Sequence, residues 1–500
     1  MKVSGLLGRL AVGMTLLALP MTAAATTTVT NNGVKQVKPA TYDETGYADG
    51  YNSVTHSFTD DSSGTYSTYL YLPSYFSTAD THRGNYQGGV QIGTNLYLVE
   101  SYNDNNNGNL VKIDLKAFHE LGLDTAGKQG ELAMAYDYFD PTTTEGQAHQ
   151  AEFDQSNAAL KAVLAKIAAN NKQLTKNNAT LTKRNGYIAN ETKWLKYWQK
   201  AQKTAQTKVT ALTKTIKADQ KQATNRRYRS ATRRKYQKLV KKYQKQLTTA
   251  KKRVTKSKAK IKSWQAKKTA QQKLVKTLKA TIKTEQATNQ TLLAQEKNTT
   301  GSQTVAAYYA KIKAVAVAGP TISTGHGQAL GYDSKHNRLF LYSSNATNPQ
   351  LQLVDQADLT TSTTYSVDSS HHPGVLTFDT SGHAYYGFFS GTSYRLYQGT
   401  YEKNVLTFKL KAIINNQTTD VNQNLAYDAY NGRLYLLGDD SLTSLPLAKL
   451  NDETLTDADL HNITFNTTKE FENISFDASG YGYITVLRSP EILKSSSPMN

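Results

Sequence analysis

The 500-residue sequence contains no cysteine and only ten prolines. The lack of cysteine excludes disulfide bonds and anchoring through a lipid-modified cysteine. No segment reaches the roughly 18 consecutive apolar residues that a transmembrane helix requires, so we expect no membrane span in the mature chain. The last residues, 488–500, have neither an LPxTG-like sorting signal nor an apolar tail, and covalent attachment to a cell wall is not expected.

The N-terminus has the pattern of a secretory signal peptide. A basic start precedes a short apolar run at 10–20, and alanines at 23–25 offer small residues for cleavage. We therefore predict a signal peptide over residues 1–25, followed by a flexible segment over 26–45. An exported chain without cysteine and rich in Thr, Asn, Lys and Tyr is typical of a Gram-positive bacterium. The expected localisation is secreted, with non-covalent retention at the cell surface as a further option.

Acidic residues are scarce in the middle of the chain. Residues 151–300 contain 38 Lys and Arg against 6 Asp and Glu, a net charge of +32, whereas the whole chain has a formal net charge of +20. The remaining residues therefore carry a net charge of −12. This asymmetry predicts a basic arm and a mildly acidic body with separate functions.

The basic region also lacks residues that interrupt helices, because neither Gly nor Pro occurs from Tyr187 to Thr300. Apolar residues recur at seven-residue intervals, which predicts a coiled coil. The first set is Ile167, Leu174, Leu181, Ile188, Leu195, Val209 and Ile216, with Gln202 as the polar exception. The second set is Val240, Leu247, Val254, Ile261, Val275 and Ile282, with Lys268 as the exception.

Both ends of this insertion must return to one body if the flanking regions form a single domain. We therefore predict a long antiparallel α-helical coiled-coil hairpin over residues 148–318, folded near Tyr228. This fold places the turn from Trp194 to Trp198 beside Ile261 and Trp264, where the indoles could form one aromatic layer. One uninterrupted long helix, or pairing of arms between two chains, remains the alternative.

The predicted tip carries a dense cluster of cations, and like charges at this spacing oppose helix formation. An anionic partner would relieve that repulsion; the alternative is a solvated surface that only aids solubility. We expect binding to anionic cell-envelope polymers such as teichoic acid, or to lipid head groups. Nucleic acid ranks below these, because the interleaved tyrosines fit heptad core positions. The predicted polyanion-binding residues are Arg226, Arg227, Arg229, Arg233, Arg234 and Lys235.

Four segments of the C-terminal half share one pattern: an apolar residue, an aromatic residue, an aspartate, a turn and an alternating strand. Their aromatic residues are separated by 46, 49 and 49 residues, namely Tyr332, Phe378, Tyr427 and Phe476. A period in the forties with paired short strands predicts a β-propeller with one four-stranded blade per repeat. The aspartates at the turns are expected to accept backbone N–H bonds there. They are Asp333, Asp379, Asp428 and Asp477.

Residues 88–101 resemble the same hairpin, which raises the number of repeats to five. The last repeat begins too near the C-terminus to finish a blade, so strands within residues 51–76 are expected to complete it. We predict an all-β propeller of five blades formed by residues 46–147 and 319–500. Six blades remain the alternative, because residues 131–139 are unassigned.

Three segments, at residues 325–333, 371–379 and 470–486, resemble the repeats of helveticin J-type large bacteriocins. These are secreted proteins of lactic acid bacteria with a propeller-like domain. The resemblance implies a propeller, and it implies bacteriolytic activity as an alternative function.

The sequence has no HExxH, GxSxG or P-loop motif, and we predict no catalytic residue, metal or cofactor. Ligand sites of propellers gather at the channel mouth, so polar residues just before each first strand are the candidates for a ligand-binding rim. They are Gln87, His326, Gln328, His372, Asn424 and Glu472. His326 and the pair His371 and His372 could alternatively converge with His82 on a metal or a sugar.

The sequence favours a non-enzymatic binding protein over an enzyme. In this interpretation, the propeller recognises a glycan or a protein and the basic coiled coil binds anionic envelope polymers. A bacteriolytic antagonist is the alternative function. A hydrolase or lyase acting on cell-wall polysaccharide is the third.

Overall fold

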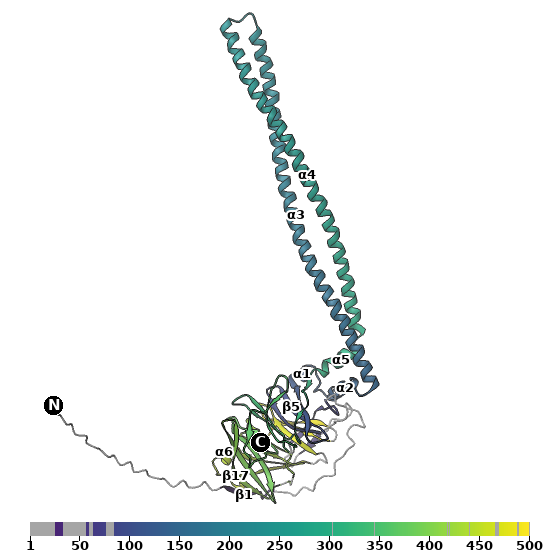
Figure 1. Ribbon diagram of the computed structural model, residues 1–500, viewed down its shortest axis with the longest axis vertical. Helices are drawn as coiled ribbons and strands as arrows, with labels where there is room; N and C mark the ends of the chain where they lie inside the picture. Colours follow the sequence, from purple (N-terminus) through teal and green to yellow (C-terminus); the bar gives the residue numbers. More distant parts are fainter. Residues whose placement is uncertain are drawn as a thin grey trace, which may run out of the picture. The chain divides into compact units, whose positions relative to one another are not determined.

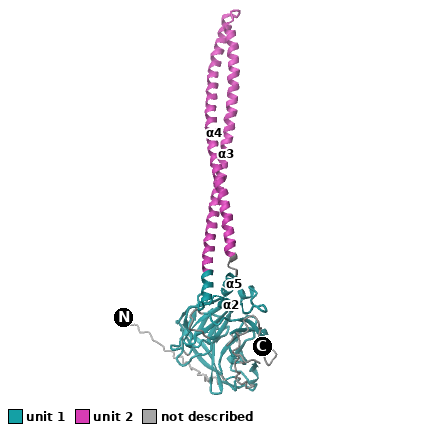
Figure 2. Ribbon diagram, turned by 90° about the vertical axis from the view of Figure 1, so that its right-hand side faces the viewer, with its two compact units in different colours: residues 1–152, 305–500 teal, residues 153–304 magenta. Residues whose placement is uncertain are grey.

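The structure is a computed structural model that describes residues 26–33, 57–59, 64–76, 85–302, 304–344, 346–417, 419, 421–439, 441–465, 470–487 and 490–499. The predicted signal peptide and His82 lie outside the described residues. The chain divides into two compact units (Figure 2). The sheet unit comprises Met1–Glu152 and Val305–Asn500, and the hairpin unit comprises Phe153–Thr304. Every described strand belongs to the sheet unit.

The described strands form five sheets. The first contains β4 (Asn85–Ile92), β5 (Asn95–Ser101), β6 (Asn107–Asp114), β7 (Ala316–Ala318) and β8 (Ile322–Ser323). The second contains β9 (Ala329–Asp333), β10 (Arg338–Tyr342), β11 (Leu351–Val354) and β12 (Thr361–Ser362). The third contains β14 (Thr377–Phe378), β15 (Ala384–Ser390), β16 (Ser393–Glu402) and β17 (Val405–Asn415), with β13 (Ser366–Val367) and β1 (Thr27–Thr30) both paired to β17.

The fourth and fifth sheets repeat the antiparallel order. The fourth contains β18 (Asn424–Asp428), β19 (Arg433–Leu437), β20 (Ser441–Pro446) and β21 (His461–Thr464). The fifth contains β22 (Phe471–Phe476), β23 (Tyr481–Val486), β24 (Glu491–Pro498), β3 (Thr65–Tyr71) and β2 (Ser57–Thr59). The prediction that residues within 51–76 complete the last repeat is confirmed, because β3 pairs with β24.

The first strands of the five sheets contact one another in the order β4, β9, β14, β18, β22 and back to β4. Apolar clusters fill the spaces between neighbouring sheets. Phe340 of the second sheet and Phe378 of the third have ring centroids 5.6 Å apart. Tyr435 of the fourth and Phe476 of the fifth have centroids 4.8 Å apart. The core is thus distributed between sheets rather than gathered in one centre.

The repeated aspartates hold the turns as the sequence predicts. Asp379 Oδ1 accepts the backbone N–H groups of Ser381 and His383 at 2.8 and 2.9 Å. Asp428 Oδ1 accepts the N–H of Tyr430 at 2.8 Å in the equivalent turn. Each carboxylate therefore satisfies donors that the tight turn leaves unpaired.

One expectation about the sheet unit is wrong for Thr27–Thr30, and the segment that left a sixth blade open is a helix. The sequence predicts a flexible segment over residues 26–45, but Thr27–Thr30 form β1 in parallel with β17, where Val29 is 2% exposed. The β-branched residues of this stretch favour a strand. Residues 131–139, which left a sixth repeat open, contain the helix α2 (Glu131–Tyr138) instead of a strand.

Short helices lie between strands of the same sheet. They are α1 (Leu115–Glu120) and α5 (Thr304–Lys313) between β6 and β7, and α6 (Leu447–Asn451) and the 3₁₀ helix η1 (Asp457–Asp459) between β20 and β21. The predicted insertion, 148–318, extends too far at its C-terminal end. Residues 305–318 belong to the sheet unit, because β7 pairs with β6. The apolar stretch at Ala316–Ala318 supplies that strand.

The hairpin unit consists of two long helices, α3 (Thr144–Thr224) and α4 (Ser230–Ser302), which run side by side (Figures 1 and 2). Contacts between distant residues show that they are antiparallel. Asn170 Nδ2 donates to the carbonyl oxygen of Glu285 at 2.8 Å, and the rings of Trp194 and Trp264 stack. The prediction that the turn from Trp194 to Trp198 lies beside Trp264 is confirmed. Buried seam residues include the predicted Leu195, Ile216, Val254 and Ile282.

Candidate functional site

The tip of the hairpin is a short connection from Asn225 to Arg229, formed without glycine. Asn225 Oδ1 accepts the backbone N–H of Arg227 at 3.0 Å, which stabilises the turn. The rings of Tyr228 and Tyr236 stack beside it at 6.2 Å between centroids. The structure brings all six predicted cations together over this turn and the first residues of α4: Arg226, Arg227, Arg229, Arg233, Arg234 and Lys235.

The cations of the hairpin have no acidic partners within the described residues. None of the ion pairs of the described chain involves a lysine or arginine of residues 153–300. The few acidic side chains there have other contacts. Glu285 accepts two bonds from Asn177 Nδ2, at 2.7 and 2.9 Å, and Glu191 is only 7% exposed. The positive charge of the helices is therefore compensated only by solvent ions or by a partner.

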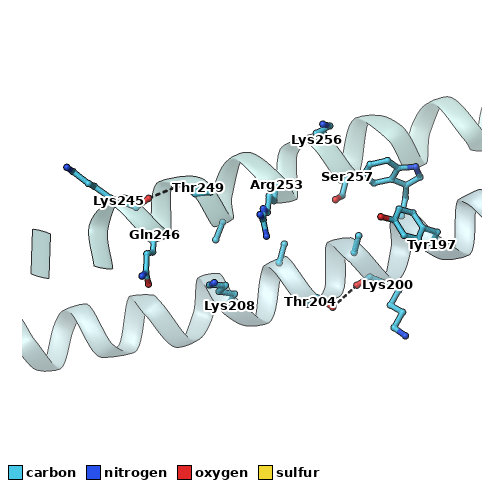
Figure 3. A pocket seen from close by; sticks show the side chains of 14 residues that line it. Tyr197, Lys200, Thr204, Lys208, Lys245, Gln246, Thr249, Arg253, Lys256 and Ser257 are labelled. Carbon is cyan, nitrogen blue, oxygen red and sulfur yellow. Dashed lines mark hydrogen bonds between the residues drawn. The ribbon is translucent and has the colours of Figure 1, made fainter. Parts of the chain in front are cut away.

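A groove of about 690 Å³ lies between α3 and α4, well away from the tip (Figure 3). Its floor has small buried side chains, because Ala205, Ala250 and Ser257 are 7%, 3% and 3% exposed. In Figure 3, Arg253 extends from α4 toward α3. The cations that line the groove are Lys200, Lys208, Lys245, Arg253 and Lys256. No acidic residue lines it.

Sequence reasoning missed this groove, although its signal is present. Large apolar residues recur along the seam, but Ala205 lies between Leu195 and Val209 of the first set, and Ala250 lies three residues beyond Leu247 of the second. Small residues at such positions leave space between two helices, which larger side chains would fill. The heptad pattern predicts where helices meet but not how completely the seam is packed.

In the sheet unit, three of the six predicted rim residues lie together: Gln87, Gln328 and Glu472. Glu472 is 2% exposed. Burial, and then the nearby charges of Glu470 and Asp439, raise the pKa of this carboxyl well above its usual value, although hydrogen bonds from Gln328 and Gln87 lower it. The buried carboxyl is therefore protonated more readily than a free glutamate.

Three further members of this polar group were not predicted: Gln423, Asp439 and Glu470. Gln423 Nε2 donates to Asp439 Oδ1 at 2.7 Å and to Glu470 Oε1 at 3.2 Å. Its Oε1 accepts a bond from Gln328 Nε2 at 2.5 Å. The sequence does contain a signal for them. Gln423 precedes the predicted Asn424, Glu470 lies two residues before the predicted Glu472, and Asp439 follows the strand that pairs with β18.

The other three predicted rim residues have separate contacts. Asn424 is 1% exposed, and its Oδ1 accepts the backbone N–H of Ile474 at 3.5 Å, so it links β18 to β22. His326 Nδ1 lies 3.3 Å from Asn105 Oδ1, and burial lowers the pKa of its imidazole. His372 Nδ1 lies 3.1 Å from the hydroxyl of Tyr342.

The alternative of a shared histidine site gains no support from these contacts. His371 Nδ1 lies 2.5 Å from Asp368 Oδ1, which gives it a partner of its own. Within the described part of the chain, no three His, Asp or Glu side chains are grouped so that they could hold a metal ion. None of the described helices is both long and apolar enough to cross a membrane.

No protein-family model matches the chain, and no curated protein matches it. Among solved structures, a crystal structure of glucose dehydrogenase matches at 14% identity and a TM-score of 0.20, covering 33% of this chain and 62% of that chain. A second glucose dehydrogenase matches at 14% identity and a TM-score of 0.21, covering 34% and 63%. The chain thus spans less than two thirds of these neighbours, and likenesses at this level carry no argument about its function.

Proposed function

We propose that the sheet unit is a five-bladed β-propeller. Five sheets of similar strand order, and first strands that contact their neighbours in turn from β4 to β22 and back, support this fold. The pairing of β3 with β24 supplies the last sheet from an N-terminal segment, as expected for a repeat array that closes on itself. Polar residues at the starts of first strands would then surround the mouth of a central channel.

We further propose that the chain is an exported, non-enzymatic binding protein of the Gram-positive cell surface. Its hairpin binds anionic envelope polymers such as teichoic acid, and the polar rim around Gln87, Gln328 and Glu472 recognises a glycan or protein. The observation that carries this proposal is the set of 38 lysines and arginines in residues 151–300 without an ion pair among the described residues. Coiled-coil surfaces ordinarily alternate charges of opposite sign, so an unpaired cationic surface favours an anionic partner.

A bacteriolytic antagonist is the second candidate, and the resemblance of residues 325–333 and 470–486 to helveticin J-type repeats favours it. In that case the same two parts dock on the envelope of a competitor and damage it. Both candidates require attachment to an anionic surface, and they differ in whether the attached protein damages the cell.

The test uses the full-length chain with washed Gram-positive cells, scored for bound protein and for lysis across a salt series from about 50 to about 500 mM. Binding that falls steeply with salt, without lysis, is expected. Cells stripped of teichoic acid should lose most of the binding. A variant in which the six predicted tip cations are replaced with glutamine tests the tip, and it should bind the cells less tightly than the natural chain. Circular dichroism verifies that its helices are intact. The replaced residues are Arg226, Arg227, Arg229, Arg233, Arg234 and Lys235.

Lysis of the cells would favour the antagonist. Release of sugars from isolated walls would instead indicate a hydrolase or lyase. Binding that does not change with salt, or that survives removal of Phe153–Thr304, would contradict the role proposed for the hairpin.

A further inference from the structure

The groove between α3 and α4 contains cations that point into it without an acceptor. Arg253 extends toward α3 in Figure 3, and Lys208 lies opposite on α3. Neither side chain forms a hydrogen bond or ion pair with any residue that the structure describes. A guanidinium in a concave site without a carboxylate is suited to an incoming anion, since its planar group of donors matches phosphate and carboxylate oxygens.

The cations extend along the groove rather than around one point. Lys200 and Lys208 are eight residues apart on α3, a distance of about 12 Å along the helix axis. Lys245 and Lys256 are eleven residues apart on α4, about 16 Å. A single small anion can contact only one part of this array. An elongated ligand with repeated negative charges can contact Arg253 and Lys208 and also reach the lysines at the edges, although Lys200, Lys245 and Lys256 extend away from the space between the helices in Figure 3.

The floor between these cations has the methyl groups of alanines and threonines, together with the polar side chains of Gln246 and Ser257. Thr204 Oγ1 donates to the carbonyl oxygen of Lys200 at 3.0 Å, and Thr249 Oγ1 donates to that of Lys245 at 3.1 Å, so both hydroxyl protons are engaged by the helices. A peptide would find donors there for its C=O groups on the lysines and Arg253, but few acceptors for its backbone N–H groups, because no carboxylate lines the groove. Bases of nucleic acid would find aromatic rings at one end only, at Tyr197 and Trp198, instead of a continuous stacking platform.

We propose that this groove binds a segment of phosphodiester polymer built on small polyols. Its phosphates contact Arg253, Lys208 and the lysines at the edges, and its carbon chain lies on the alanine and threonine floor. The inference rests on the proposed function of the hairpin and adds a second binding location, the groove, to the predicted site at the tip. A volume of about 690 Å³ accommodates a few repeat units.

Intrinsic fluorescence can locate the ligand, because all three tryptophans lie in the hairpin and Trp198 lines the groove. The tip lies about 40 Å from Trp198 along the helix. The full-length chain is titrated with a synthetic glycerol-phosphate oligomer of about eight units, and tryptophan emission and affinity are recorded. If five cations neutralise phosphates, the logarithm of the affinity should fall against the logarithm of salt with a slope of about −3.5. A Trp198→Phe variant should lose most of the emission change, which would assign that change to the groove.

Two kinds of variant separate the groove from general electrostatics. Lys208→Gln with Arg253→Gln should weaken binding on the order of tenfold and reduce the salt slope by about 1.4. The matched control, Lys214→Gln with Lys241→Gln, removes the same charge outside the groove and should have a much smaller effect. Ala201→Leu fills the groove without changing charge and should also weaken binding. Circular dichroism and thermal unfolding verify that each variant keeps its helices.

The outcomes distinguish this inference from the proposed function. Equal loss in the groove variant and its control, with no effect of Ala201→Leu, would overturn the groove as the site but leave the hairpin as a polyanion-binding arm. Absence of polyanion binding at about 150 mM salt would overturn both. Equal or tighter binding of single-stranded oligothymidylate or polyglutamate with the same number of charges would overturn the polyol phosphodiester as the ligand class.

Discussion

Trp194 of α3 stacks on Trp264 of α4, with ring centroids 5.9 Å apart and ring planes inclined by 12°. Lys267 Nζ lies 4.6 Å from the centroid of the Trp264 ring, and Tyr197 contacts Trp194 edge to face at 5.6 Å. Trp194 is nevertheless 41% exposed. This aromatic layer is one of several contacts between the arms, together with polar contacts such as that of Asn170 with Glu285.

Replacing Trp264 with alanine should destabilise the hairpin by about 1–2 kcal/mol, because the stacked pair and the cation contact are lost at a half-exposed site. Thermal unfolding followed by circular dichroism at 222 nm, which is dominated by α3 and α4, measures the effect. Trp198→Phe retains an aromatic ring and is the control. An unchanged melting temperature would show that the layer does not determine the alignment.

Replacing Asp379 with alanine should lower the free energy of unfolding of the sheet unit by about 2–4 kcal/mol. Asp379 is 5% exposed, and its loss leaves two backbone N–H groups and the hydroxyl of Tyr385 without this acceptor. Urea unfolding followed by tyrosine circular dichroism checks the value. Asp358→Ala, in an exposed turn, should change stability much less, because water can replace the lost acceptor there. Similar losses in both variants would contradict the turn role.

Stability of the sheet unit should depend on pH through Glu472. Since the folded-state pKa is raised by burial and by Glu470 and Asp439, the folded chain binds this proton more tightly than the unfolded chain. The stabilisation is thus fully present below the ordinary glutamate pKa of 4.5 and is lost as the pH rises through the folded pKa. Glu472→Gln should therefore be more stable than the natural chain at pH 8, on the order of 1–3 kcal/mol, and equal to it at pH 4. If the natural chain and Glu472→Gln lost the same stability between pH 4 and pH 8, the pH dependence would come from groups other than Glu472.

Replacing Leu70 with alanine should destabilise the sheet unit by about 2–4 kcal/mol through a cavity in the core. Leu70 lies on β3, is 0% exposed, and belongs to a cluster with Leu98 and Ile492. Ser67→Ala, on the same strand but only half-buried, is the control. If Leu70→Ala cost no more than its control, β3 would be a peripheral addition rather than part of the core.

Local patterns in the sequence predict much of this fold. Each hairpin with its aspartate, such as Asp379 or Asp428, is specified within about fifteen residues, and the heptads specify the long helices. The alignment of Trp194 with Trp264 follows from the position of the turn alone. These features depend on short-range periodicity and turn chemistry, which a single sequence displays.

Features that depend on distant contacts could not be predicted. Val29 belongs to β1, which pairs with β17 nearly four hundred residues away in sequence. The four-residue sequence of β1 does not indicate which strand it pairs with. The polar group around Glu472 takes Gln423 and Asp439 from other sheets. The groove exists because the small side chains of Ala205 and Ala250 leave space between α3 and α4. The size of that space depends on how the two helices pack together, which the sequence of one helix does not specify.

The pairing of β6 with β7 joins segments that lie about two hundred residues apart in sequence. A disordered connection of that length would impose a large entropic cost on closing the first sheet. Because α3 and α4 fold back on each other by local contacts, the two ends of the connection are already near one another once the helices have formed. Once α3 and α4 have formed, the inserted arm therefore imposes only the small entropic cost of a short loop on the pairing of β6 with β7. Early formation of the two helices should accordingly increase the rate at which the first sheet is completed.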